Sequence, residues 1–191
     1  MKPTPIIAVI GDARLPAGDP REVFAEDLGR RIVDAGWRLQ TGGLGGVMEA
    51  ASRGGRASER WSSGSILGIL PGWDPAEANA YVDIALPTGL DHGRNAIVAQ
   101  ADAVVAIGGG AGTLSELAFA WMLHRFVIAR RGEGWAGRLA DAPLDDRVRY
   151  PDIPDDQVFG VDMAEEAIAL IQTRLPSYGR RHNGVRRRHP R

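Results

Sequence analysis

Residues 108–116, Gly-Gly-Gly-Ala-Gly-Thr-Leu-Ser-Glu, carry the residue types best suited to binding a phosphate group. The apolar run 103–107 comes directly before them and predicts a buried strand, and Leu114, Leu117 and Trp121 then follow at helical spacing. Glycines let a ligand approach the backbone closely, and a helix start presents unpaired N–H groups with partial positive charge. The stretch therefore predicts a strand, a glycine turn and a helix that bind a phosphorylated ligand.

A second glycine turn, residues 41–46, follows a predicted strand at 37–40, and Gly11 ends a predicted first strand at 6–10. Ligands of parallel sheets bind outside the carboxyl ends of the strands, so the turns are expected to line one crevice. Neither turn has the dinucleotide fingerprint, which argues against ordinary NAD binding and leaves mononucleotides open. A purely structural turn is the alternative at both places. The predicted phosphate or ligand contacts are Gly11, Thr41, Gly42, Gly43, Gly45, Gly46, Gly109, Gly110, Ala111, Gly112 and Thr113.

Glu116 has two interpretations. Residues 113–116 match a capping box, in which Thr113 begins the helix and exchanges hydrogen bonds with Glu116. Alternatively, the Glu116 carboxylate stands at the phosphate-binding end of the helix and acts on a sugar or on water. The sequence leaves both interpretations open.

Arg94 and Asn95 lie at the start of a helix predicted around residues 92–100. An arginine here grips a phosphate through two hydrogen bonds, or it is a solvated residue with Asp91 as the N-cap. Asn95 binds a base or sugar, or lies on the helix surface. For His92, a capping or exposed role is favoured over contact with a ligand.

Composition narrows the function classes. The 191 residues, 44% hydrophobic and 25% charged, fit one globular domain, and no apolar run is long enough to span a membrane. The chain has no Cys, and its four His lack metal-ligand spacing, so we expect no disulfide and no metal site. No signal-peptide pattern is visible at the N-terminus, and we expect a cytoplasmic protein. The only lysine is Lys2, which excludes a Walker phosphate loop and a pyridoxal-phosphate Schiff base in the body of the chain.

The order of elements predicts an α/β fold. Apolar strands alternate with helices, which is typical of a Rossmann-like, doubly wound parallel sheet of about seven strands with helices on both faces. Strands are predicted at 6–10, 37–40, 66–70, 81–86, 103–107, 126–129 and 157–160. Helices are predicted at about 20–35, 92–100 and 163–174, after the second glycine turn through about residue 52, and after the glycine turn at 108–112, where Leu114, Leu117 and Trp121 share one face. Residues 130–156 are predicted to form an irregular surface excursion. One domain is expected over residues 1–175, followed by a basic, disordered tail at 176–191, where nucleic-acid binding is the less favoured interpretation.

Four motifs, in this order, resemble the lonely guy superfamily, whose members are also called possible lysine decarboxylases. They are residues 41–50, residues 68–72, the Arg94-Asn95 pair and residues 109–116. The resemblance implies a Rossmann-like fold over residues 6–175. The superfamily also includes nucleoside 5′-monophosphate phosphoribohydrolases, in which the residues matching Arg94 and Glu116 are the catalytic pair. Here Gly108 replaces a proline of the hydrolase motif, and Asn95 stands where the hydrolases commonly have lysine.

Within the superfamily the chain is most similar to the molybdenum cofactor carrier-like branch. The evidence is Gly-Val-Met-Glu-Ala at 46–50, Tyr-Val-Asp-Ile at 81–84, and asparagine after Arg94. The resemblance implies a carrier that requires no cofactor for chemistry and holds a phosphorylated pterin as cargo. A phosphoribohydrolase and a regulatory nucleotide sensor are the alternatives. A homodimer or higher homo-oligomer is also implied, with Trp121 and Met122 as candidates for its interface.

Overall fold

The computed structural model describes residues 3–179. Its centre is a sheet in the order β4-β3-β2-β1-β5-β6-β7, and every neighbouring pair of strands is parallel. The strands are β1 Ile6–Gly11, β2 Arg38–Thr41, β3 Ile66–Leu70, β4 Ile84–Pro87, β5 Ala103–Ile107, β6 Phe126–Arg130 and β7 Phe159–Val161. The predicted seven-stranded, doubly wound α/β fold is confirmed, with β2 and β7 displaced by one or two residues from their predicted ranges.

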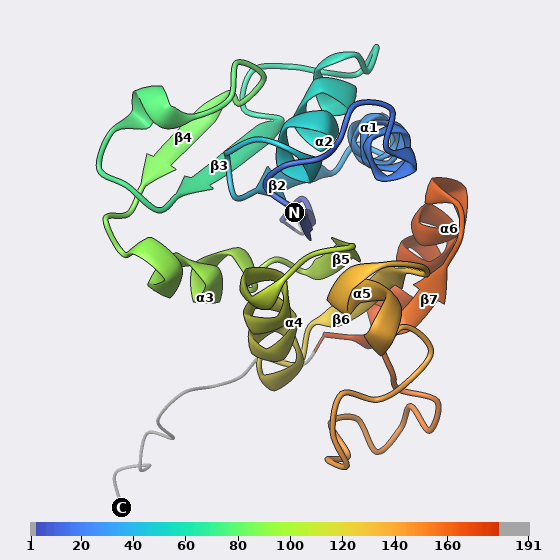
Figure 1. Ribbon diagram of the computed structural model, residues 1–191. Helices are drawn as coiled ribbons and strands as arrows, with labels where there is room; N and C mark the ends of the chain where they lie inside the picture. Colours follow the sequence, from blue (N-terminus) through green and yellow to red (C-terminus); the bar gives the residue numbers. More distant parts are fainter. Residues whose placement is uncertain (1–2, 180–191) are drawn as a thin grey trace, which may run out of the picture.

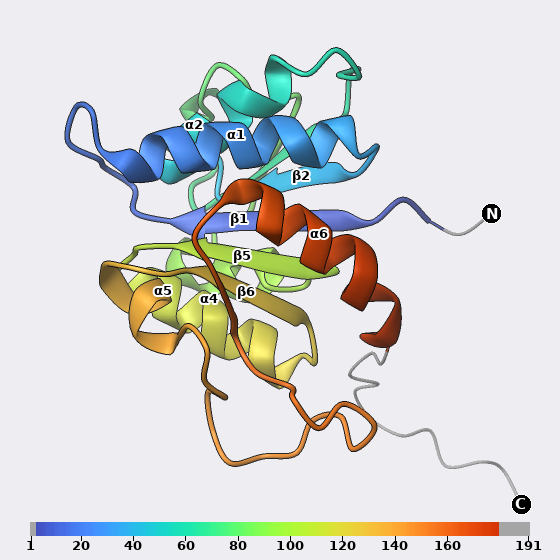
Figure 2. The same ribbon diagram turned by 90° about the vertical axis from the view of Figure 1, so that its right-hand side faces the viewer.

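Helices cover both faces of the sheet (Figures 1 and 2). One face packs against α1 Pro20–Asp34, α2 Val47–Arg56 and α6 Ala164–Arg174, and the other packs against α3 Asn95–Val98, α4 Ala111–Met122 and α5 Gly134–Leu139. Along β1, Ile7 and Val9 join the first core while Ala8 and Ile10 join the second. This two-sided burial explains why the central strands are apolar at every position.

Helix α2 is longer than the sequence predicts, because two helix glycines serve packing. A Cβ on Gly54 would overlap with the backbone of Glu26, and one on Gly29 would overlap with the backbone of Ala51. The glycines therefore let α1 and α2 approach closely, and this contact offsets the usual cost of glycine inside a helix. The predicted end of α2 near Ser52 is wrong for this reason, and the helix continues to Arg56.

Two other elements differ from their predicted ranges. Strand β4 begins at Ile84 rather than residue 81, because the carboxylate of Asp83 is held by the backbone N–H of Ile66 (3.0 Å) and the indole of Trp61 (3.1 Å) before strand pairing starts. In place of a continuous helix at 92–100, residues Asp91–Arg94 form a 3₁₀ turn that leads into the short helix α3.

The segment 130–156 supports the glycine turn. It contains α5, whose first N–H groups bind the turn: Trp135 N donates to Gly109 O (3.0 Å) and Ala136 N donates to Gly108 O (2.9 Å). Farther along, Arg149 donates to the carbonyl oxygens of Trp121 and Arg125 at the other end of α4. The prediction of an irregular excursion is therefore wrong for residues 134–139.

The packed part of the chain extends to Tyr178. Its ring lies 4.7 Å from that of Phe126 and 4.8 Å from that of Tyr150. The predicted boundary at residue 175 therefore leaves a core side chain outside the domain. Residues 180–191 of the predicted tail lie outside the described residues. Within residues 3–179, no helix combines the length and apolarity that crossing a membrane requires.

Candidate functional site

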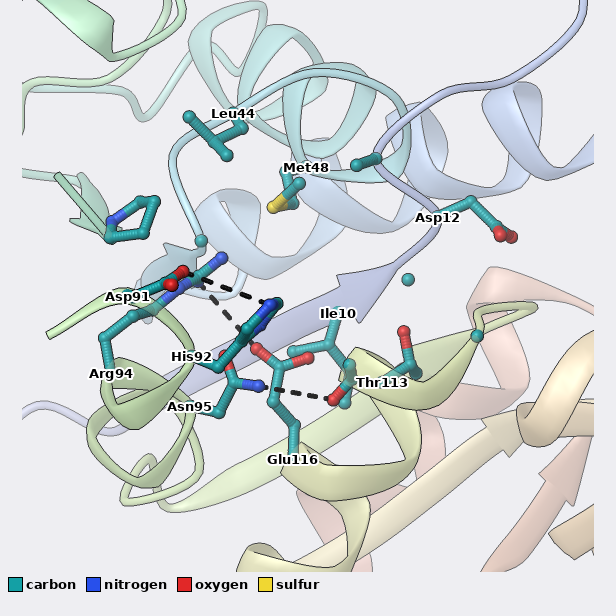
Figure 3. Close-up of a pocket in the computed structure, with 16 residues that line it drawn as sticks. Ile10, Asp12, Leu44, Met48, Asp91, His92, Arg94, Asn95, Thr113 and Glu116 are labelled. Atoms are coloured by element: carbon teal, nitrogen blue, oxygen red, sulfur yellow. Dashed lines mark hydrogen bonds and ion pairs between the residues drawn. The ribbon is translucent and has the colours of Figure 1, made fainter.

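A cavity of about 370 Å³ lies at the carboxyl ends of the central strands (Figure 3). It opens where the chain order of the strands reverses, between β1 and β5, which is the usual ligand position in such folds. Eight of the predicted site residues line it: Gly11, Gly42, Arg94, Asn95, Gly110, Gly112, Thr113 and Glu116.

The start of α4 forms one wall of the cavity. The helix begins at Ala111 with Gly110 as N-cap, and its first turn closes with the bond from Leu114 N to Gly110 O (3.0 Å). Thr113 therefore lies inside the first turn, and Glu116 lies in the second. The capping-box interpretation is wrong, because the N-cap is Gly110, three residues before Thr113, and Glu116 is left free to project into the cavity (Figure 3).

Four backbone N–H groups at this helix start, those of residues 110–113, make no hydrogen bond within the described chain. This is the usual state of the first turn of a helix, where the donors have no intrahelical partner. A Cβ added to Gly110 or Gly112 would meet nothing within 4 Å, although both residues line the cavity. The absent side chains therefore leave open space directly beside the free donors.

Arg94 and Glu116 face each other across the cavity floor, with Arg94 Nη1 3.8 Å from Glu116 Oε1 (Figure 3). Both are buried, with 9% and 6% of their surface exposed. Burial raises the pKa of Glu116 to about 7, against the opposing effect of the Arg94 charge. Burial also lowers the pKa of Arg94. Nη1 of Arg94 is buried and has no hydrogen-bond partner in the described part of the chain, which leaves an unsatisfied donor beside the cavity.

Gly42 leaves the space that the Arg94 guanidinium occupies. A Cβ at this position would overlap with the guanidinium of Arg94 and lie within 2.6 Å of Sδ of Met48. The glycine therefore lets the guanidinium approach the backbone after β2 closely. This contact gives Gly42 a steric role beside the predicted one of donating an N–H group.

Asn95 joins α3 to α4. Its Nδ2 donates to Ser115 Oγ (2.7 Å) and is 3.5 Å from Gly112 O, while Ser115 Oγ donates to the same carbonyl (2.7 Å). The amide nitrogen is therefore committed to protein contacts. Only the carbonyl end of Asn95 remains for a ligand.

The other predicted residues do not line this cavity. Thr41 is fully buried and its Oγ1 accepts from Gly43 N (3.1 Å), while Gly43 has a left-handed φ of 77°. Gly45 and Gly46 line a separate cavity of about 470 Å³ on the far side of Ala13. The Gly109 N–H donates to Asp12, and Ala111 is the exposed first residue of α4.

The sequence prediction missed part of the cavity wall. Asp12, Leu44, Met48 and Pro71 line it, as does Asp91, which the sequence suggested only as a cap. Leu44 lies within the second glycine turn and Met48 lies two residues after it, and these positions are the signal that could have found them. His92 also lines the cavity but is largely exposed. Among residues 3–179, no group of three or more His, Asp or Glu side chains could hold a metal ion.

The sequence profile of the SLOG cluster4 family matches residues 4–151. The chain belongs to the SLOG cluster4 family. This confirms the resemblance to the lonely guy superfamily. An uncharacterized protein of Archaeoglobus fulgidus is 39% identical to this chain over 98 residues. The matched residues cover 51% of this chain and 62% of the Archaeoglobus protein.

Two solved structures are similar over nearly their whole lengths. The molybdenum cofactor binding protein from Rippkaea orientalis is 34% identical, has a TM-score of 0.74, and matches over 91% of this chain and 98% of that one. The molybdenum cofactor carrier protein from Chlamydomonas reinhardtii is 29% identical, has a TM-score of 0.71, and matches over 91% and 99%. The similarity to these proteins also confirms the predicted Rossmann-like architecture and the carrier-like branch of the superfamily.

Proposed function

We propose that this chain is a carrier that binds the molybdenum cofactor as cargo and holds it by its phosphate. The observation that carries the proposal is the pairing of two kinds of unused donor across one cavity. The free N–H groups of residues 110–113 lie on one side, and the unpartnered Nη1 of Arg94 lies on the other. Helix starts and arginines are the two devices that proteins most often use for phosphate.

The rest of the cavity suits a flat heterocycle. Ile10, Leu44 and Met48 supply apolar walls, and the volume of about 370 Å³ falls within the usual range for small-molecule sites. With a pKa of about 7, Glu116 is protonated in about half of the molecules at neutral pH and in most of them at lower pH. A neutral carboxyl can donate or accept a hydrogen bond and does not repel the phosphate. Binding of this kind needs no covalent step by the protein.

Similarity supports the identity of the cargo. The Rippkaea protein is a molybdenum cofactor binding protein and the Chlamydomonas protein is a molybdenum cofactor carrier, and both match this chain almost end to end. Thermal unfolding of the purified protein with molybdopterin and with nucleoside monophosphates tests the proposal, since a ligand that binds only the folded state raises the Tm. We expect the larger shift with molybdopterin. A shift with nucleotides and none with saturating molybdopterin would contradict the proposal.

A phosphoribohydrolase is the second candidate, and the buried Arg94–Glu116 pair supports it. A carboxyl group with a pKa near 7 is suited to proton transfer at neutral pH, and it would assist departure of the base from the ribose. Incubation with AMP followed by chromatography for free adenine tests this. Release of adenine that disappears in Glu116→Gln would favour the hydrolase over the carrier.

We also infer that the chain forms a homodimer or a higher homo-oligomer. Glu116 is the only charged residue of α4, and on the outer side of the helix Met122 is 46% exposed. Of the two suggested interface residues, Trp121 is buried against Arg149 and belongs to the core. Light scattering of the wild type and of Met122→Lys measures the association, which we expect the substitution to weaken.

A further inference from the structure

Asp12, the first residue after β1, contacts three segments that meet at the cavity. Its backbone oxygen accepts from Val47 N, the first residue of α2 (2.9 Å). Its Oδ2 accepts from Gly109 N and from Nη1 of Arg21, each at 2.8 Å. Asp12 therefore ties the start of α2 to the glycine turn before α4, and it connects both to α1 through Arg21.

The turn that Asp12 holds has an unusual backbone. Gly108 and Gly109 have φ values of 61° and 88°, in the left-handed region that favours glycine. The carbonyl of Gly109 is fixed by Trp135 N, and its N–H is fixed by the Asp12 carboxylate. The chain enters α4 directly after this turn, so these two bonds determine where the free N–H groups of residues 110–113 point.

The charge of Asp12 needs compensation, because its side chain is 27% exposed and the residue lines a cavity that we assign to an anion. Arg21 provides part of it. Its guanidinium pairs with Asp12 through Nη1 and with Asp19 through Nε (2.9 Å) and Nη2 (2.5 Å), and it also lies 3.6 Å from Glu133, so three carboxylates share one positive charge. These partners raise the pKa of Arg21, so its positive charge is retained. Opposite charge at contact distance reduces the repulsion that Asp12 exerts on a nearby phosphate.

We propose that Asp12 is a positioning residue for anion binding: it holds the Gly109 turn so that the α4 donors face the cavity, and Arg21 offsets part of its negative charge. The inference rests on the proposed phosphate site, but it does not depend on which phosphorylated ligand is bound. Neither Asp12 nor Arg21 is assigned a contact with the ligand itself. The role is indirect, so its test must separate geometry, charge and stability.

Inorganic phosphate is the probe, and its Kd is measured by ³¹P NMR titration alongside the Tm of each variant. Asp12→Ala removes both the turn contact and the charge, and we expect phosphate to bind at least tenfold more weakly. Arg21→Gln leaves the Asp12 charge uncompensated, and binding weakens again. Adding Asp12→Asn to Arg21→Gln removes that charge and keeps an oxygen for Gly109 N, so the double variant recovers affinity.

Asp102→Ala is the matched control. The Asp102 carboxylate also accepts from a backbone N–H, that of Ile6 (2.8 Å), at the opposite end of β1 from the cavity. This variant is expected to lose stability without a change in phosphate Kd. A merely structural Asp12 would behave in the same way.

The outcomes separate this inference from the proposed function. Unchanged phosphate affinity in Asp12→Ala, no recovery in the double variant, or no phosphate binding by the wild type would each overturn the role of Asp12. If phosphate binding depends on Asp12 but the protein does not bind molybdopterin, the positioning role is supported and only the proposed cargo is contradicted.

Discussion

Gly112→Ala is expected to stabilise the protein while weakening ligand binding. Gly112 is the second residue of α4, it has no left-handed φ, and an added Cβ meets nothing within 4 Å. Alanine costs about 0.5–1 kcal/mol less than glycine inside a helix. In a domain of this size that gain raises the Tm by about 1–4 °C.

The opposite effect on affinity follows from where the methyl group points. Gly112 lines the cavity, so the new carbon occupies the space next to the free N–H groups where we place the phosphate. Displacing the phosphate by even a fraction of its hydrogen-bond distance weakens several charge-assisted bonds together. We expect at least a tenfold weaker Kd, which is about 1.4 kcal/mol.

Denaturant unfolding and calorimetric titration of the same samples measure both effects. Gly54→Ala is the matched control, because it is also a helix glycine but its Cβ would overlap with the backbone of Glu26. It should lose about 1–3 kcal/mol of stability, as overpacked sites do, and keep its ligand affinity once folded. Destabilisation by Gly112→Ala, or unchanged affinity in that variant, would refute the reasoning.

Three further predictions concern charge and the chain end. Arg94→Met should weaken binding of a phosphorylated ligand about 10- to 150-fold, the range for losing a charged hydrogen bond, and leave the Tm nearly unchanged or higher; titration and thermal unfolding measure this. The pKa of Glu116 in the folded state is about 7 and lies above the unfolded value, so its contribution to stability is fully present below about pH 4.5 and is lost as the pH rises to about 7. The stability of Glu116→Gln relative to wild type should therefore increase between these two pH values. An unchanged difference in stability between about pH 4.5 and 8 would contradict the raised pKa. Truncation after Gly179 should leave the Tm and ligand affinity unchanged, whereas truncation after Leu175 also removes the buried Tyr178 and should cost about 3 kcal/mol of stability in denaturant unfolding.

Local sequence patterns predicted the sheet and one wall of the cavity. Runs such as 103–107, apolar at every position, identify strands that are buried on both faces, and each glycine turn directly follows such a strand. Because the carboxyl ends of parallel strands share an edge, Gly42 and Gly112 were correctly placed near one crevice. Arg94 was predicted from its position at the start of the helix expected around residues 92–100, and it does line the cavity.

What the sequence could not provide depends on contacts between distant residues. The bond from Gly109 N to Asp12 joins residues 97 positions apart, and no short pattern signals it. The capping-box pattern at 113–116 was misleading, because flexible glycines allow α4 to begin earlier. Similarly, Gly54 weakens a helix by propensity alone, and only the approach of α1 explains why α2 continues through it.

The central claim is that the start of α4 and Arg94 together hold the phosphate of the cargo. The most direct measurement compares the Kd of molybdopterin with that of molybdopterin dephosphorylated by a phosphatase, for the wild type and for Arg94→Met. We predict that removing the phosphate weakens wild-type binding at least tenfold and has a much smaller effect in Arg94→Met. Equal affinity of the wild type for both ligands would contradict the account.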